Sequence, residues 1–139
     1  MIAIIYWSET GNTETMAKAI RKGIEQAGET AELIFVDAAS ADTITSYDKI
    51  AFGCPSRGVD ELEQDDFEPY FESIEANLNG KPVALFGSYG WGDGEWMEDW
   101  VERTKAAGAK LYTDDGFIMQ EDELDEDACV AFGEGFAAF

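Results

Sequence analysis

The chain has 139 residues, with 30 acidic and nine basic side chains, no histidine and a formal net charge of −21. A surface this acidic repels nucleic acids and anionic membranes, so we expect neither as a partner. The absence of histidine removes the commonest general base and metal ligand, and it excludes Ser-His and Cys-His catalysis.

Apolar runs typical of buried strands alternate with segments of helical period from end to end. Runs rich in β-branched and aromatic residues predict strands over residues 2–7, 31–36, 47–54, 82–88 and 110–119, the last interrupted around 114–116. Apolar residues every three to four positions predict helices over 12–27, 67–78, 95–107 and 125–138.

This alternation predicts one domain over residues 1–139, with a parallel sheet covered by helices on both faces. Chain chirality makes the crossovers between parallel strands right-handed. The order of the strands does not follow from periodicity. The fold class is therefore a three-layer α/β/α sandwich of short βα units.

The segment Ser8–Thr13 follows the first predicted strand and opens the first predicted helix. A helix start offers unpaired N–H groups and a positive dipole end, and Gly11 lets the backbone approach a ligand closely. No lysine or arginine occurs over residues 1–17, so a phosphate here would be held by neutral donors. The alternative is an ordinary capped helix start, which uses the same residue types. The candidate side-chain donors are Ser8, Thr10, Asn12 and Thr13.

Two more loops follow predicted strands, GCPSRGVD over Gly53–Asp60 and GSYGWGDGEW over Gly87–Trp96. Together with YWSETGNTE, they make the chain resemble the short-chain flavodoxins of the clostridial type over nearly its whole length. The resemblance implies a doubly wound sheet of order 2-1-3-4-5. It also implies one non-covalently bound FMN and the function of a low-potential one-electron carrier rather than an enzyme.

The resemblance places the FMN phosphate in the loop Ser8–Thr13 and the flavin ring between the other two loops. Trp91 matches the aromatic residue that stacks on the ring, with packing on its own domain as the alternative. Asp60 matches an acidic hydrogen-bond acceptor for the ring. The implied cofactor-binding residues are Ser8, Glu9, Thr10, Gly11, Asn12, Thr13, Pro55, Ser56, Arg57, Gly58, Val59, Asp60, Ser88, Tyr89, Gly90, Trp91 and Gly92. No catalytic or metal-binding residue is implied.

Arg57 and Val59 depart from the family pattern. Arg57 either lies near the flavin, where its charge would raise the second reduction potential, or turns to solvent and pairs with Asp60 or Glu61. Val59 matches a position that takes positive φ in one state of the loop, which is unfavourable for a β-branched residue. We therefore expect weaker stabilisation of the one-electron-reduced flavin than in typical relatives.

Acidic residues cluster after three predicted strands, over residues 60–66, 93–99 and 121–126. This negative rim is expected to dock redox proteins with basic patches, both reductases and low-potential acceptors. The alternative is that these acids only complement the dipoles of helix starts. The runner-up function is a small FMN-dependent quinone or nitro-compound reductase, which the short connections disfavour. A response-regulator-like domain would need an acidic pair after the first strand, where the chain has Trp7, Ser8 and Glu9.

Cys54 and Cys129 stand far apart and in no metal-binding spacing. We expect two reduced thiols, although the sequence also permits a disulfide. The N-terminal residues lack the basic region and long apolar run of a secretory signal, and no stretch is long enough to cross a membrane. A cytoplasmic monomer without membrane contact is therefore expected.

Overall fold

The computed structural model describes residues 1–57 and 60–139. Strands and helices alternate along the chain, with two short 3₁₀ turns over Val36–Ala38 and Glu75–Asn77. The strands are β1 (Ile2–Tyr6), β2 (Ala31–Phe35), β3 (Lys49–Gly53), β4 (Pro82–Tyr89), β5 (Lys110–Leu111) and β6 (Phe117–Gln120). The helices are α1 (Asn12–Gln26), α2 (Ala41–Ser46), α3 (Phe67–Ile74), α4 (Glu95–Ala106) and α5 (Glu126–Ala138).

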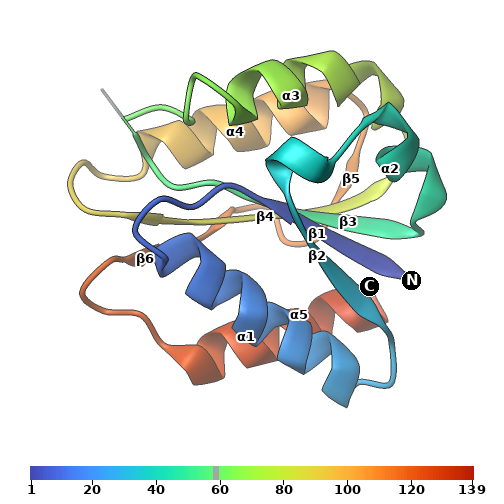
Figure 1. Ribbon diagram of the computed structural model, residues 1–139, viewed down its shortest axis with the longest axis horizontal. Coiled ribbons are helices and arrows are strands. Elements are labelled where there is room, and N and C mark those ends of the chain that lie inside the picture. Colours follow the sequence, from blue (N-terminus) through green and yellow to red (C-terminus); the bar gives the residue numbers. More distant parts are fainter. Residues whose placement is uncertain (58–59) are drawn as a thin grey trace.

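The strands form one parallel sheet of order β2-β1-β3-β4-β5, which confirms the predicted fold class (Figure 1). β5 pairs with Pro82 and Val83 at the start of β4, and β6 pairs with residues 86–89 at its end. β5 and β6 are therefore the two halves of the predicted fifth strand. The break between them agrees with the predicted interruption around 114–116.

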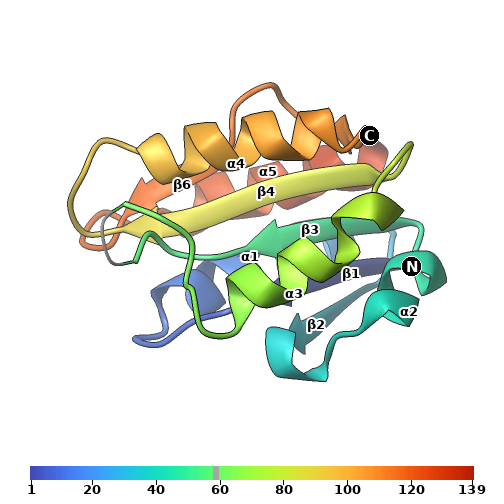
Figure 2. The ribbon, with the colours of Figure 1, turned by 90° about the horizontal axis from the view of Figure 1, so that it is seen from above.

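Both faces of the sheet are covered by helices, with α3 and α4 on one side and α1 and α5 on the other (Figures 1 and 2). Alternate residues of β1 therefore enter two separate cores. Ala3 and Ile5 belong to the core under α3 and α4, whereas Ile2, Ile4 and Tyr6 belong to the core under α1 and α5. This double burial explains why β1 is a continuous apolar run.

The periodicity predicts no helix between residues 36 and 47, but α2 lies there. Its start is a capping box, in which the hydroxyl of Thr43 accepts a hydrogen bond from the amide of Ser40 at 3.0 Å. Ile44 is its one buried residue. A helix this short, with a single buried position, leaves no helical period in the sequence. Among the described residues, no helix is both long and apolar enough to cross a membrane.

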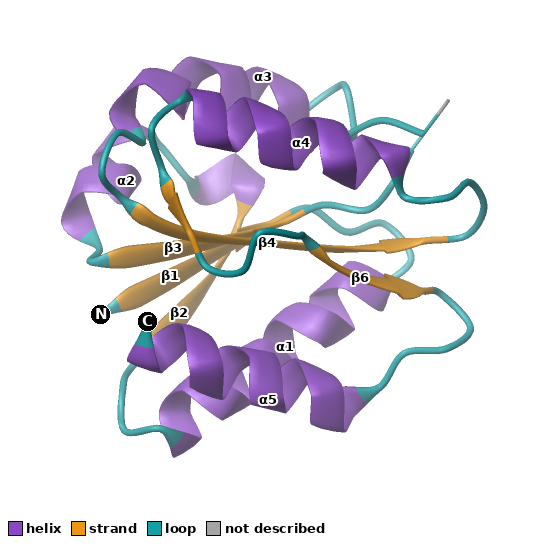
Figure 3. Cartoon of the chain, turned by 180° about the vertical axis from the view of Figure 1, so that it is seen from behind, coloured by secondary structure: helices purple, strands orange, loops and turns teal. Residues whose placement is uncertain are grey.

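Helices α1 and α5 lie side by side on one face of the sheet (Figure 3). Glycines allow their backbones to approach closely. A Cβ atom on Gly23 would lie 1.9 Å from the carbonyl oxygen of Val130, and one on Gly133 would lie 2.1 Å from that of Ile20. Because these neighbours are backbone atoms, no change of rotamer can make room for a side chain.

Replacing Gly23 with alanine tests this contact. Alanine favours an isolated helix by about 1 kcal/mol, whereas overpacking a core typically costs about 1–3 kcal/mol. Because the clash is with backbone, we expect Gly23→Ala to lower the free energy of unfolding by roughly 1–2 kcal/mol in urea titrations. Glu25→Ala, on the exposed side of the same helix, is the control and should change it by less than about 0.5 kcal/mol. A stabilised Gly23→Ala variant would contradict the close approach.

Candidate functional site

Loops that are far apart in the sequence meet at the carboxyl edge of the sheet, on the left of Figure 1. Backbone hydrogen bonds continue the pairing of the strands into these loops. They run from the amide of Trp7 to the carbonyl of Gly53 at 3.0 Å, from Ser56 to Ser88 at 3.0 Å, and from Glu121 to Tyr89 at 2.9 Å. The three loops predicted from sequence are thus held next to one another.

The loop Ser8–Thr13 passes into α1 through Gly11, whose φ of +96° is a left-handed conformation that glycine adopts readily. The hydroxyl oxygen of Ser8 accepts hydrogen bonds from the amides of Gly11 at 3.2 Å and Glu14 at 3.3 Å. The N-cap residue of α1 is Gly11, so Ser8 satisfies the amide of Glu14 in the first turn from outside the helix. These bonds do not use all of the donors of the loop.

Several backbone amides of this loop have no hydrogen-bond partner within the described part of the chain, among them those of Thr10, Asn12 and Thr13 next to the start of α1. They lie at the positive end of the α1 dipole, where an anion is stabilised. The side-chain amide of Asn12 donates to the hydroxyl of Thr10 at 3.1 Å and so braces the loop. This donor set fits a phosphate group without any cation of its own.

The start of α1 is fixed to β4 by a buried pair of hydroxyls. The oxygens of Thr13 and Ser88 lie 2.9 Å apart, and each residue is 1% exposed. The Thr13 hydroxyl, a candidate phosphate donor from sequence, thus already has a partner inside the protein. Its position sets the distance between the helix start and the loop after β4.

Arg57 lies at this site, but not as the sequence analysis expects. Its guanidinium forms an ion pair with Glu9 at 2.7 Å and stands over the ring of Trp7, 5.5 Å from the ring centroid. Neither Asp60 nor Glu61 supplies the carboxylate, so the predicted pairing is wrong. The Trp7 face and the Glu9 carboxylate together offer a cation–π contact and a charge-assisted hydrogen bond. Gly58 and Val59 lie outside the described residues, and what the sequence predicts for them stays a prediction.

Trp91 is 66% exposed on the loop after β4, whereas Trp96 and Trp100 are 2% and 1% exposed. Trp96 and Trp100 therefore belong to the core under α3 and α4. Within the described chain, Trp91 makes no contact with another aromatic ring. Most of this indole is thus open to solvent and available to a ligand.

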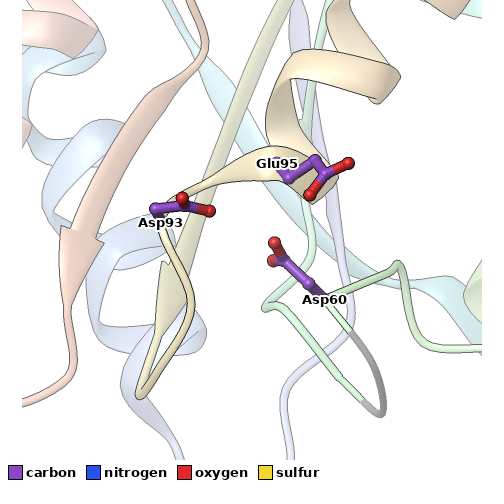
Figure 4. A group of neighbouring side chains, drawn as sticks. All are labelled: Asp60, Asp93 and Glu95. Atoms are coloured by element: carbon purple, nitrogen blue, oxygen red, sulfur yellow. The ribbon is translucent and has the colours of Figure 1, made fainter.

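Three carboxylates converge between this loop and the loop after β3 (Figure 4). One carboxylate oxygen from each of Asp60, Asp93 and Glu95 lies within 4.8 Å of the other two. The hydroxyl of Ser56 donates to Asp60 at 3.1 Å. Gly92 permits this approach, since a Cβ there would stand 3.3 Å from the carboxyl carbon of Asp60. The arrangement concentrates negative potential where the two loops meet.

Not every acidic residue of the three clusters belongs to an exposed rim. Glu63 is only 6% exposed and accepts hydrogen bonds from three amides at the start of α3, at 2.9, 2.9 and 2.7 Å. Asp125 accepts one from the amide of Ala128 at 3.2 Å and caps α5. These two carboxylates stabilise helix starts, which is the alternative stated for the clusters. Apart from partly buried Asp60, the other members are exposed.

The flavodoxin family model matches residues 4–133 of the chain. The flavodoxin of Clostridium beijerinckii is 42% identical over 134 residues, which cover 96% of this chain and 97% of that protein. The chain belongs to the flavodoxin family. The flavodoxin of Megasphaera elsdenii is 47% identical over 111 residues, or 80% of this chain and 81% of that one.

Solved structures agree with this assignment. The solution structure of two-electron reduced Megasphaera elsdenii flavodoxin has a TM-score of 0.91 and 41% identity, with 100% of both chains covered. A flavodoxin from the domain Archaea has a TM-score of 0.84 and 27% identity, covering 99% of this chain and 97% of that one. Flavodoxins are FMN-binding electron carriers rather than enzymes. The expected cofactor and function are thus confirmed, and the reductase alternative is not favoured.

Two residues that line this edge of the sheet are not predicted as site residues from the sequence. Trp7 and Glu121 line a cleft together with Ser8, Thr10 and Ser88. Both stand at the carboxyl end of a strand, where sites form in this topology, and that position is the signal that could have found them. Cys54 and Cys129 are free and buried, as expected for two reduced thiols.

The hydroxyl pair predicts a non-additive mutant cycle. Thr13→Val leaves the buried Ser88 hydroxyl without its partner, which costs about 1–3 kcal/mol, and Ser88→Ala does the same to Thr13. Removing both hydroxyls leaves no unpaired group, so the double variant should be more stable than the sum of the two single losses predicts. Urea unfolding of the four proteins measures this. Losses that simply add would show that the two hydroxyls do not depend on each other.

Proposed function

We propose that this chain, as a single domain over residues 1–139, holds one FMN at the junction of the three loops. It then passes electrons one at a time, at low potential, between other proteins. When bound, FMN supplies a centre that accepts and releases single electrons. The observation that carries the proposal is the set of amides at Thr10, Asn12 and Thr13 that have no partner among the described residues, at the same edge of the sheet as the loop with the exposed Trp91.

The first helix start is proposed to bind the phosphate. The three free amides donate to its oxygens, with the hydroxyl of Thr10 beside them. Ser8 holds the loop in shape through its bonds to the amides of Gly11 and Glu14. Because the donors are neutral, the α1 dipole provides the favourable field for the anion.

The flavin ring is proposed to lie between residues 55–60 and 88–92. Trp91 offers a flat apolar face, and stacking removes that face from water. Asp60 accepts a hydrogen bond from the ring edge, and Ser56 holds its carboxylate in place. The nearby charges of Asp93 and Glu95 disfavour additional negative charge on the ring. This field is the physical reason for a low potential.

Flavin binding by Trp91 is testable with purified protein. We expect excess FMN to colour the protein yellow and to quench both its tryptophan emission and the flavin fluorescence. Trp91→Ala should weaken FMN binding on the order of tenfold, which corresponds to the roughly 1.4 kcal/mol of a good aromatic contact. Phe139→Ala is the control, because Phe139 is also an exposed aromatic residue at 48% but lies at the far end of α5. A protein that stays colourless with excess FMN would refute the proposed function.

The exposed acids around the loops are proposed to dock basic redox proteins, both reductases and low-potential acceptors. A groove of about 760 Å³ beside α4 extends this surface. Its apolar lining includes Met97, Val101 and Ile118, and its acidic lining consists of Asp93, Glu98, Asp99, Glu102, Asp114 and Asp115. Lysine and arginine side chains of a partner can lay their aliphatic stems on the apolar part and their charges against the carboxylates. Such contacts are small, transient and sensitive to salt. They suit a monomeric carrier in the cytoplasm, where the two thiols stay reduced.

Electron transfer to a basic acceptor tests the groove. In stopped-flow reactions of the reduced protein with cytochrome c at low salt, Glu98→Gln/Glu102→Gln should slow the second-order rate roughly three- to tenfold. The effect should shrink at about 0.5 M salt, where exposed charges are screened. Glu25→Gln/Glu29→Gln, in the last turn of α1 and just beyond it, removes the same charge from exposed positions and should have a smaller effect. Equal slowing by both pairs would mean that net charge, and not this groove, attracts the partner.

A further inference from the structure

An ion pair crosses the cleft beside the start of α1. The guanidinium of Arg57 lies 2.7 Å from the carboxylate of Glu9, and the two side chains are 45% and 54% exposed. Both residues line the same cleft as Ser8, Thr10 and Thr13. A cation from the loop after β3 is thus brought onto the loop after β1.

Glu9 is an unusual residue for a loop that binds an anion. It stands between Ser8 and Thr10, in the middle of the neutral donors, and its charge opposes a phosphate dianion at short range. The only other charged residue over positions 1–17 is also acidic, Glu14. Glu121 adds a third carboxylate, which lines the cleft from the other side. The positive charge that balances Glu9 therefore has to come from a different part of the chain.

Arg57 supplies this positive charge, and both its side chain and its backbone are held in place. Its guanidinium stands over Trp7, 5.5 Å from the ring centroid, so the aromatic face supports the cation while the carboxylate binds it. The backbone of Arg57 is also anchored, because it exchanges two hydrogen bonds with Glu61, at 2.7 and 3.0 Å. These contacts direct the side chain toward Glu9 rather than toward solvent.

We propose that Arg57 is a positioning residue for the cofactor phosphate, which acts by neutralising Glu9. With the pair intact, the loop presents neutral donors and no net charge to the dianion. The pair thereby increases the preference of the protein for phosphorylated flavin over riboflavin, which lacks the phosphate. This inference rests on the proposed binding of FMN at the loop.

The test compares FMN with riboflavin, because the ratio of their dissociation constants isolates the phosphate. Fluorescence titrations at about 0.1 M salt, where the Debye length is about 10 Å, limit the comparison to nearby charges. In Arg57→Met, which keeps an apolar stem but loses the charge, FMN should bind roughly three- to tenfold more weakly. Riboflavin affinity should change less than about twofold, because the uncompensated Glu9 has no phosphate to repel.

Repeating the Arg57→Met substitution in a Glu9→Gln variant shows whether Arg57 acts through Glu9 or on the phosphate directly. With no carboxylate to neutralise, the Arg57→Met substitution should change FMN affinity by less than about twofold. An undiminished loss in that background would mean that Arg57 binds the phosphate directly and would overturn the proposal. An equal loss for FMN and riboflavin would also overturn it, because Arg57 would then act on the ring.

Two controls complete the design. Lys22 forms another exposed ion pair, with Glu126 at 3.2 Å, and lies about 14 Å along α1 from Thr13. Lys22→Met removes this cation and should leave both affinities unchanged. Thermal unfolding of each variant shows whether the fold is retained. Failure of the unmodified protein to bind FMN would refute the proposed function. Normal FMN binding with an unchanged FMN-to-riboflavin ratio in Arg57→Met would refute this inference alone.

Discussion

The pairing of parallel strands is the constraint on which the site depends. All strands of the sheet end at one edge, so the chain must turn there after each of them. The hydrogen bonds between Trp7 and Gly53, and between Ser56 and Ser88, extend the strand register into the turns. Loops separated by more than 30 residues therefore hold fixed positions without any disulfide. The Thr13–Ser88 hydroxyl pair adds the same kind of link between a helix start and a strand.

Much of the fold could be predicted, because burial on both faces leaves a strong trace in the sequence. β1 is a continuous apolar run, as is β3 from Ile50 onward, since α1 and α5 cover one side of these strands and α3 and α4 the other. α2 could not be predicted, because Ile44 is its single buried residue and one residue cannot define a period. The sheet order came from the family resemblance, since pairing between distant strands leaves no local signal.

The loops of the site could also be predicted, whereas their side-chain contacts could not. Gly11 has to be glycine because of its positive φ, and that requirement is visible in the sequence. Asp60 and Glu61 are the acidic residues nearest to Arg57 in the sequence, whereas only the fold brings Glu9 and Trp7 to its side chain. Glu63 looks like its exposed acidic neighbours in the sequence, but burial makes it a helix cap.

A net charge of −21 opposes the binding of a phosphorylated cofactor. The opposition is weaker than the net charge implies, because exposed charges farther away than the Debye length of about 8 Å are largely screened at physiological salt. At the proposed site, the phosphate would meet the first turn of α1, with its dipole, the amides that have no partner among the described residues, and one balanced ion pair. The remaining acidity lies on the outer surface, where it can act on partner proteins from a distance. In this proposal, the balanced ion pair at the start of α1 allows the phosphate to bind, while the acidic outer surface attracts basic partner proteins. The two requirements therefore do not conflict.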